Sequence, residues 1–398
     1  MVALLIFGLT LLAAVLISEL ADRSIVSTAV LFLMVGFAAG EHALGLIALQ
    51  ADAPVISRLA DFALVAVLFT DGMKLGWREL RSAWHLPGRA LFFGLPLTMG
   101  ATALLAHYAA GVSWLNAWLI GAVLSPTDPV FAAAIVGRSG VSQRLRHLLN
   151  VESGFNDGLA LPIVLGLLAL GGAAEGRVVM NIVELVAGVV IGIVVPWVAL
   201  RFERTRFFAI ARSHEPFFPF AIGIVVFAFA ELVHANQFLA AFTAGVTMAT
   251  LRRDQAREVD AFGEQFAELL KLAALLVFGG LISPAFLREV PLEGYAFGLL
   301  ALFVARPAAI ALALWGARLE WRNKVAAMWF GPKGFASVIY GLMVLGSGLE
   351  GANESFHLIA IVIVGSILAH SSTDVVMARW LKCTPKAGDA LAAGSVQP

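Results

Sequence analysis

The sequence Ser-Pro-Thr-Asp-Pro, residues 125–129, interrupts an apolar segment that extends from residue 114 to residue 136. Two prolines three positions apart remove backbone donors and crowd the preceding turn, so a helix through this segment is predicted to unwind. Unwinding leaves free carbonyls beside the Thr127 hydroxyl and the Asp128 carboxylate, and such oxygen atoms suit a small hard cation. A proline kink in which Asp128 only caps the second half-helix is also open.

A second polar motif, Asn-Val-Glu-Ser-Gly-Phe-Asn-Asp-Gly, occupies residues 150–158. At 3.6 residues per turn Glu152 and Asn156 share one helix face, and Ser153 and Asp157 share the adjoining face. Counted from the cytoplasmic surface, Asp157 lies ~13 Å deep, close to the bilayer midplane. Ionisable groups are expensive there, so we expect Asp157 to exchange protons rather than only to hold helices together.

A third motif, Gly-Pro-Lys-Gly at residues 331–334, breaks another apolar segment. Lys333 lies about ten residues deep and needs a carboxylate partner, for which Glu152, Asp128 and Asp157 are candidates. A structural ion pair and a direct role in the mechanism are both open. The two interrupted segments are the fifth and the twelfth along the chain, so they cross the membrane in opposite directions. Paired interruptions of this kind are typical of inverted-repeat secondary transporters.

The composition places the chain in a lipid bilayer. Of its 398 residues 60% are hydrophobic and 14% are charged, and the mean hydropathy is +0.89. Soluble domains carry about 45–50% apolar and 25% charged residues, so a soluble, disordered or nucleic-acid-binding protein is excluded. The formal net charge of +0 gives no sign of a polyanionic partner. Cys383 is the single cysteine, which rules out an intrachain disulfide.

Charged and turn-rich breaks divide the chain into thirteen predicted membrane-spanning helices. Cytoplasmic loops are enriched in Lys and Arg, and these residues test the division. With the N-terminus outside and the C-terminus in the cytoplasm, 21 of the 27 Lys and Arg residues fall in cytoplasmic segments, and two, Arg177 and Arg288, fall in outer loops. The predicted ranges are 2–20, 25–41, 56–73, 90–109, 114–136, 148–170, 179–200, 215–233, 237–250, 262–284, 294–317, 323–346 and 356–380.

Residues 1–382 are predicted to form one integral-membrane unit, followed by a short disordered cytoplasmic tail, residues 383–398. The loops are too short for a soluble catalytic domain. The sequence contains neither a Walker A motif nor a His-Glu-x-x-His motif, which argues against an ATP-driven pump and a zinc protease. We therefore expect no enzymatic activity and no cofactor.

Further charged residues fall inside the predicted helices. Arg306, directly before a proline, is expected to pair with a buried acid or with backbone carbonyls. Asp71, near the cytoplasmic end of the third helix, is expected either to line a cytoplasmic funnel or to remain a solvated interfacial acid. Lys271 is expected to extend toward the membrane surface and to pair with Glu264 and Glu268 on its own helix.

Taken together, these motifs resemble the signatures of the NhaP-like branch of the monovalent cation:proton antiporter superfamily, within the sodium/hydrogen exchangers. The resemblance extends over about residues 5–382, and its most specific part is the Asn-Asp pair in its Glu-Ser context. The residues that carry it are Pro126-Thr127-Asp128, Glu152-Ser153-Gly154-Phe155-Asn156-Asp157 and Gly331-Pro332-Lys333-Gly334, with weaker matches at Phe69-Thr70-Asp71, Arg306-Pro307 and Phe238-Leu239-Ala240-Ala241-Phe242.

The resemblance implies a homodimer of thirteen-helix chains, each with a dimerisation domain and a six-helix core. In that core the discontinuous fifth and twelfth helices cross. The resemblance also implies that Asp157 binds a cation, Na⁺ or K⁺, and a proton alternately. Thr127, Asp128 and Ser153 would then lie near the ion.

The family pattern further implies that an arginine of the twelfth helix holds Glu152 and the neighbouring Asn156. This chain has Lys333 where that arginine stands. Arginine is always charged and makes forked contacts, whereas a buried lysine can lose its proton. Lys333 is thus expected to be either a fixed strut or a second proton carrier.

We therefore expect a secondary antiporter that exchanges protons for monovalent cations by alternating access, in the bacterial inner membrane. Na⁺ is the first expectation, with K⁺ and Li⁺ as alternatives. One carboxylate cannot hold a proton and a cation together, so competition at Asp157 enforces exchange. The alternative function is a sodium-coupled organic anion symporter of related fold, and a third is a channel or a non-transporting sensor. The expected partners are the transported ions, the bilayer and a second copy of the chain, without nucleic acid.

Overall fold

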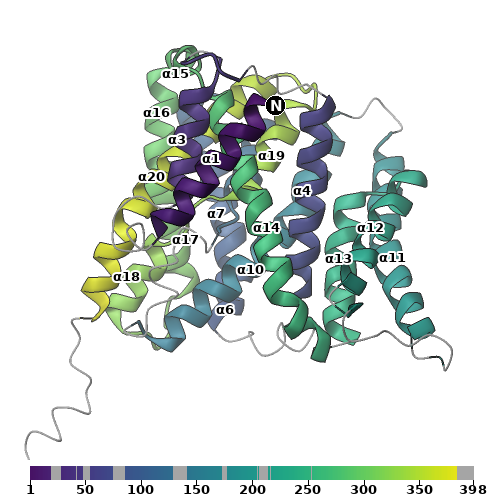
Figure 1. Cartoon of the computed structure of the whole chain (residues 1–398). Coiled ribbons are helices and arrows are strands. Elements are labelled where there is room, and N and C mark those ends of the chain that lie inside the picture. The colour runs from purple at the N-terminus through teal and green to yellow at the C-terminus, as the bar shows by residue number, and fades with distance from the viewer. Residues whose placement is uncertain are drawn as a thin grey trace, which may run out of the picture.

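The computed structural model describes residues 1–18, 28–41, 43–47, 54–74, 86–128, 141–172, 177–203, 205, 214–215, 217–251 and 253–382. These residues fold into a bundle of helices that stand side by side (Figure 1). Over the same ranges the only strand-like pairing is a bridge between Gly40 and Ile47. Each predicted membrane-spanning range overlaps a described helix, and the prediction of an all-α membrane protein is confirmed.

The helices have the following bounds: α1 Val2–Leu16, α3 Thr28–Ala39, α4 Pro54–Met73, α6 Leu86–Arg89, the π-helical turn η1 Ala90–Gly94, α7 Leu95–Ala110, α8 Trp114–Leu124, α10 Gln143–Gly171, α11 Arg177–Glu203, α12 Phe217–Leu232, α13 Gln237–Leu251, α14 Arg253–Leu281, α15 Pro284–Glu289, α16 Leu292–Leu300, the π-helical turn η4 Ala301–Ala305, α17 Arg306–Ala313, α18 Trp321–Trp329, α19 Phe335–Leu345 and α20 Ala352–Lys382.

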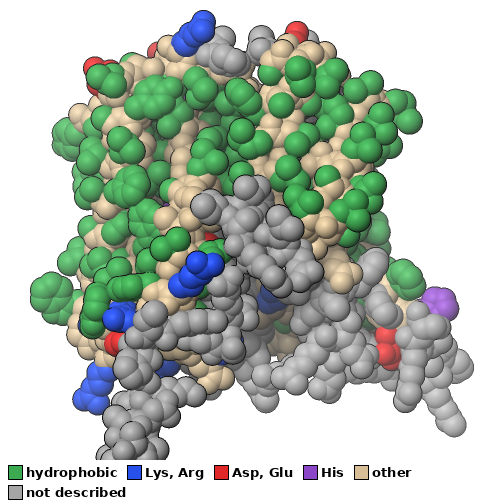
Figure 2. Space-filling view, turned by 60° about the vertical axis from the view of Figure 1, so that its left-hand side comes forward, with side chains coloured by type: hydrophobic (Ala, Val, Ile, Leu, Met, Phe, Trp, Pro, Cys, Tyr) green, Lys and Arg blue, Asp and Glu red, His purple; other side chains and the backbone are tan. Residues whose placement is uncertain are grey.

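The outer surface of the bundle suits contact with lipid. Within the described chain, five helical stretches are long and apolar enough to cross a membrane, the longest being Ala352–Leu381. Large apolar side chains remain exposed, among them Val179 at 70% and Leu292 at 80%. Figure 2 shows hydrophobic side chains covering the face between the two ends, with Lys and Arg mostly in its lower part. A surface of this kind is stable against hydrocarbon rather than water.

The helices pack in two groups. The first comprises α1, α3, α4 and α11 to α14, and the second comprises α6 to α8, α10 and α16 to α20. In the first group α4 and α13 lie very close, and glycine at positions 72 and 245 permits this. A Cβ at either position would overlap with the backbone of the facing helix. The groups meet where α10 contacts α4, α11 and α13, and where α19 contacts α14 and α4.

Both interruptions predicted from proline occur in the structure. The twelfth predicted helix is divided into α18 and α19 by the non-helical residues 330–334. In the fifth, α8 ends at Leu124 and residues 125–128 are non-helical. The second half of that helix, residues 129–136, and the predicted tail, residues 383–398, lie outside the described residues.

The fourth and eleventh predicted helices share an unusual feature. Each contains a π-helical turn, η1 or η4, that ends two residues before a proline, Pro96 or Pro307. The two helices pack against each other, with α17 against η1 and α7 against η4. Their positions, seven helices apart, agree with the spacing expected of an inverted repeat. Such turns often mark functional sites, and η4 ends directly before Arg306.

One predicted boundary is clearly wrong. The tenth helix was predicted to begin at residue 262, but α14 begins at Arg253. The prediction ended the helix at charged residues, whereas an amphipathic helix continues through them beyond the apolar part of the membrane.

Candidate ion and proton site

The polar motifs of α8 and α10 meet in the interior. Ser153 and Asn156 lie on successive turns of α10 and both reach Thr127, in the non-helical segment after α8. The Thr127 and Ser153 hydroxyl oxygens are 3.2 Å apart, and the Asn156 amide donates to the Thr127 Oγ1 at 2.7 Å. All three side chains are buried. The helical period and the proline interruption together thus create a cluster of side-chain oxygens.

Asp128 joins the two interruptions. Its backbone N–H donates to the Pro332 carbonyl at 2.9 Å, and its carboxylate accepts the Phe335 N–H at 3.4 Å at the start of α19. A Cβ at Gly334 would overlap with the Cβ of Asp128, so glycine is required for this approach. The Lys333 N–H, in turn, donates to the Ser366 Oγ of α20 at 2.9 Å. The non-helical backbone therefore finds partners within the protein, as it must at membrane depth.

Asp157 lies on α10 and is only 5% exposed. Among the described residues, its carboxylate has neither a hydrogen bond nor an ion pair. Its backbone carbonyl, however, accepts the Tyr340 hydroxyl at 2.9 Å. Asp71 and Asp128 are near enough for their charges to act on Asp157. Beside Asp157, the Oδ1 of Asn156 is buried without a partner in the described chain. A buried acceptor of this kind is available to a ligand.

Arg306 holds Glu152. Its guanidinium donates to Glu152 Oε1 at 2.8 Å and to the Phe330 carbonyl at 2.9 Å, and both charged side chains are buried. The sequence left a buried acid or backbone carbonyls open as partners of Arg306, and the side chain contacts one of each. The implied contact of Glu152 with a cation of the twelfth helix is wrong, because Arg306 comes from α17 in the eleventh. A Cβ at Gly331 would overlap with the Arg306 guanidinium, so this glycine leaves room for the contact.

Lys333 does not form any of its predicted ion pairs within the described part of the chain. Its ammonium donates instead to the Pro126 carbonyl at 3.4 Å, in the other interruption. Lys333 therefore binds a backbone carbonyl of the other non-helical segment.

Lys271 was assigned wrongly from the sequence. Its Nζ lies 3.9 Å from Asp128 Oδ2, and its side chain is 15% exposed, so it extends into the site rather than toward the membrane surface. The ten residues 272–281 that complete α14 are uncharged, which places Lys271 ~15 Å from that end of the helix. This depth in the membrane is the sequence feature that indicates a buried role for Lys271. The acids Glu264 and Glu268 on the same helix favour the other interpretation, local pairing near the membrane surface.

The remaining predicted residue, Asp71, is buried near the end of α4 and lies 3.5 Å from Lys74, three residues on. Its funnel role remains a prediction. Tyr340 was missed altogether, because a single tyrosine in an apolar helix carries no distinctive pattern. Its contact with Asp157 depends on how α19 packs against α10.

Comparisons with known proteins identify the family. Residues 8–380 match the family described as sodium/hydrogen exchanger, transmembrane. The chain is 26% identical over 391 residues to the K⁺/H⁺ antiporter NhaP of Alkalimonas amylolytica, covering 95% of this chain and 67% of that protein. It is 27% identical over 283 residues to the Na⁺/H⁺ antiporter NhaP of Pseudomonas aeruginosa, covering 64% of each.

The fold is also similar to a solved structure. The sodium proton antiporter MjNhaP1 of Methanocaldococcus jannaschii at pH 8 superposes with a TM-score of 0.77 over 96% of this chain and 99% of that chain, at 17% identity. The similar proteins are transporters and not enzymes. This chain therefore belongs to the sodium/hydrogen exchanger family and is a multi-pass membrane cation/proton antiporter.

Proposed function

We propose that the chain exchanges protons for a monovalent cation at Asp157, which carries each in turn. The observation that supports this is the distribution of charge among the four buried acids in and around the polar motifs. Glu152, Asp71 and Asp128 each have a cationic side chain within 4 Å, at 2.8, 3.5 and 3.9 Å respectively. Among the described residues the carboxylate of Asp157 has none. A buried carboxylate without a counter-charge is costly in the membrane, so it favours binding a proton or a cation.

The neighbouring oxygens suit the cation-bound state. Thr127 and Ser153 offer hydroxyl oxygens, Asp128 offers a carboxylate, and Asn156 has an unpartnered Oδ1. Carboxylate, hydroxyl and amide oxygens are ligands for hard cations. A proton on the Asp157 carboxyl removes the charge that attracts the cation, so the two substrates compete. Exchange of one proton for one monovalent cation carries no net charge.

The two packing groups support a proposal of alternating access. Asp157, Asp128 and the two interruptions belong to the second group, and α10 contacts α4 and α13 of the first. We propose that movement of the second group against the first exposes Asp157 to one side of the membrane and then to the other. The two groups then serve as the core and the dimerisation domain of a homodimer. The proposed location is the bacterial inner membrane, with the N-terminus outside and the C-terminus in the cytoplasm.

The transported cation is proposed to be Na⁺ or K⁺, with Li⁺ as a further alternative. The Pseudomonas relative is named as a Na⁺/H⁺ antiporter, and the Alkalimonas relative is named as a K⁺/H⁺ antiporter. Both ions are compatible with an oxygen-lined site, and Na⁺ remains the first expectation. An organic anion symporter is not favoured, because the named relatives exchange cations for protons.

The test is a ΔpH dye assay on proteoliposomes that contain the purified chain. Na⁺, K⁺, Li⁺ and choline are added in turn between pH 6 and 9. At least one alkali cation is expected to dissipate the gradient, and choline is not. Asp157→Asn keeps the shape of the side chain and is expected to abolish exchange while the protein remains folded. Glu293→Gln, at the exposed start of α16, is the matched control. Full exchange by Asp157→Asn would eliminate the proposed site.

A further inference from the structure

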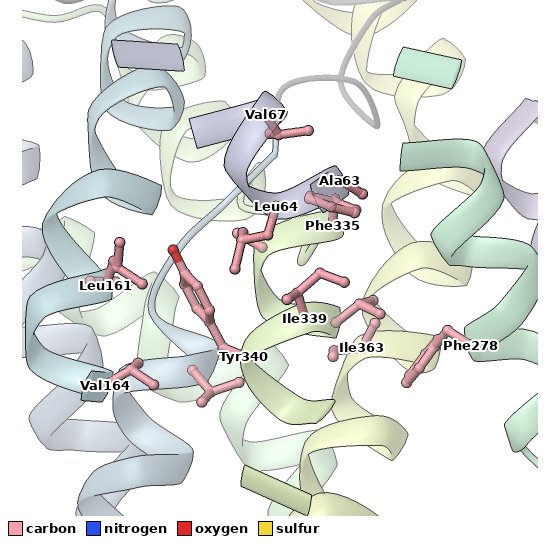
Figure 3. Close-up of a cluster of buried hydrophobic side chains, with 14 of the residues drawn as sticks. Ala63, Leu64, Val67, Leu161, Val164, Phe278, Phe335, Ile339, Tyr340 and Ile363 are labelled. Atoms are coloured by element: carbon pink, nitrogen blue, oxygen red, sulfur yellow. The ribbon is translucent and has the colours of Figure 1, made fainter. Parts of the chain in front are cut away.

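Tyr340 is fully buried, and its hydroxyl reaches the helix turn that carries Asp157. The hydroxyl donates to the Asp157 backbone carbonyl at 2.9 Å, across the contact between α19 and α10. Figure 3 shows the ring between Leu161 and Val164 of α10 on one side and Ile339 of α19 on the other. Apolar packing therefore fixes the ring, and the hydroxyl is left to make a directed contact.

The turn that receives this bond is weakened by the sequence. Pro162 lies inside α10, and it has no N–H to donate to the carbonyl of Gly158, four residues earlier. Gly158 also carries no side chain, and a Cβ there would overlap with the Phe242 ring of α13. Glycine and proline both reduce the rigidity of a helix. The Gly158 carbonyl thus lacks its helical donor, and the carbonyl of the preceding residue, Asp157, receives an external bond from Tyr340.

The other end of α19 is attached to the second acid of the site. The Phe335 N–H, at the start of α19, donates to Asp128 Oδ2 at 3.4 Å, and Gly334 lies directly against the Asp128 side chain. Phe335 and Tyr340 are five residues apart, which corresponds to ~7.5 Å along the helix. One rigid helix is therefore bonded to Asp128 near its beginning and to Asp157 farther along.

We propose that α19 sets the spacing between Asp128 and Asp157 and that Tyr340 is the positioning residue at the Asp157 end, so that it tunes discrimination among monovalent cations. This inference rests on the proposed antiport at Asp157. Discrimination between ions of one charge depends on cavity size, ligand number and rigidity of the ligands. A looser Asp157 adapts to ions of different radius, and the site then distinguishes them less well.

Tyr340→Phe removes the hydroxyl and keeps the packed ring. The control is Tyr295→Phe, because the Tyr295 hydroxyl also donates to a backbone carbonyl, that of Leu287, at 2.6 Å and outside the site. Apparent KM values for Li⁺, Na⁺ and K⁺, the maximal rates and the thermal unfolding temperature are measured for each variant. The free energy of one hydrogen bond corresponds to about a three- to tenfold change in an equilibrium constant. We therefore expect the ratio of the highest to the lowest KM to fall about threefold or more in Tyr340→Phe. Tyr295→Phe is expected to keep the wild-type ratio.

A second variant tests the same account from the α10 side. Pro162→Ala restores an N–H that can donate to the Gly158 carbonyl, and it therefore stabilises this helical turn. In this background Tyr340→Phe is expected to change the KM ratio less than it does alone. Equal effects of Tyr340→Phe on the KM ratio in the wild-type and Pro162→Ala backgrounds would overturn the proposal.

The outcomes separate this inference from the proposed function. Absence of exchange in the wild type, or exchange retained by Asp157→Asn, refutes the antiport site, and the role of Tyr340 falls with it. Exchange that is lost in Asp157→Asn, together with an unchanged KM ratio in Tyr340→Phe, overturns the positioning role alone. A lower rate and a lower unfolding temperature at an unchanged ratio also overturn it, because they indicate a structural role only.

Discussion

Replacing Arg306 with Gln should destabilise the protein strongly. The substitution leaves the Glu152 carboxylate buried without its counter-charge, and it removes the donor 2.9 Å from the Phe330 carbonyl at the end of α18. Removal of one partner from a buried ion pair costs about 3–5 kcal/mol. For a chain of this size, that loss corresponds to a fall in unfolding temperature on the order of 4–6 °C.

The companion variants show whether the pair itself is responsible. Glu152→Gln alone should also destabilise the protein by about 3–5 kcal/mol, since it leaves the guanidinium buried without a carboxylate. The double variant Glu152→Gln and Arg306→Gln contains neither buried charge. Its loss of stability should therefore be smaller than the sum of the two single losses by about 1–3 kcal/mol.

The assay is thermal unfolding in detergent, followed by tryptophan fluorescence. Arg288→Gln, on the exposed side of α15, is the matched control, and its unfolding temperature should remain within about 1 °C of the wild type. The reasoning is refuted if Arg306→Gln unfolds at the wild-type temperature. It is also refuted if the losses in the double variant simply add.

Two further substitutions test the site. Gly334→Ala places a Cβ against Asp128 and should lower the exchange rate by about tenfold or more. The control Gly346→Ala, at the end of α19, makes only ordinary contact and should keep the wild-type rate. Equal rates in the two variants would contradict the requirement for glycine at position 334. Lys271→Gln removes the cation 3.9 Å from Asp128 and should change the apparent KM for the cation by about threefold or more. Lys324→Gln on α18 is its control, and a wild-type KM in Lys271→Gln would exclude Lys271 from the site.

The features that the sequence predicts well depend on local rules. A proline has no N–H wherever it stands, so the interruptions near Pro126 and Pro332 follow from the residues alone. The helical period likewise places Ser153 and Asn156 on adjoining faces, and both side chains do reach Thr127. Boundaries at the membrane surface are less secure, because a charged residue such as Arg253 can begin a helix as well as end one.

The pairings across helices do not follow from local rules. Arg306 and Glu152 are 154 positions apart, and Tyr340 and Asp157 are 183 positions apart. Which of them meet depends on the packing of α10 against α19 and on the space left by glycine. Lys271 demonstrates the difficulty, since acids on its own helix offered a simpler partner than Asp128. Only the three-dimensional arrangement decides between them.

The arrangement also explains why a lysine is sufficient at position 333. Glu152 already has a permanently charged partner, because one guanidinium nitrogen of Arg306, from α17, donates to its carboxylate and to the Phe330 carbonyl. The ammonium of Lys333 instead contacts one carbonyl, that of Pro126, for which a single directed donor is enough. Anchoring of Glu152 and satisfaction of the interrupted backbone are thus divided between two residues. Among the described residues Lys333 has no carboxylate within 4 Å, so it does not take the place of Arg306 beside Glu152.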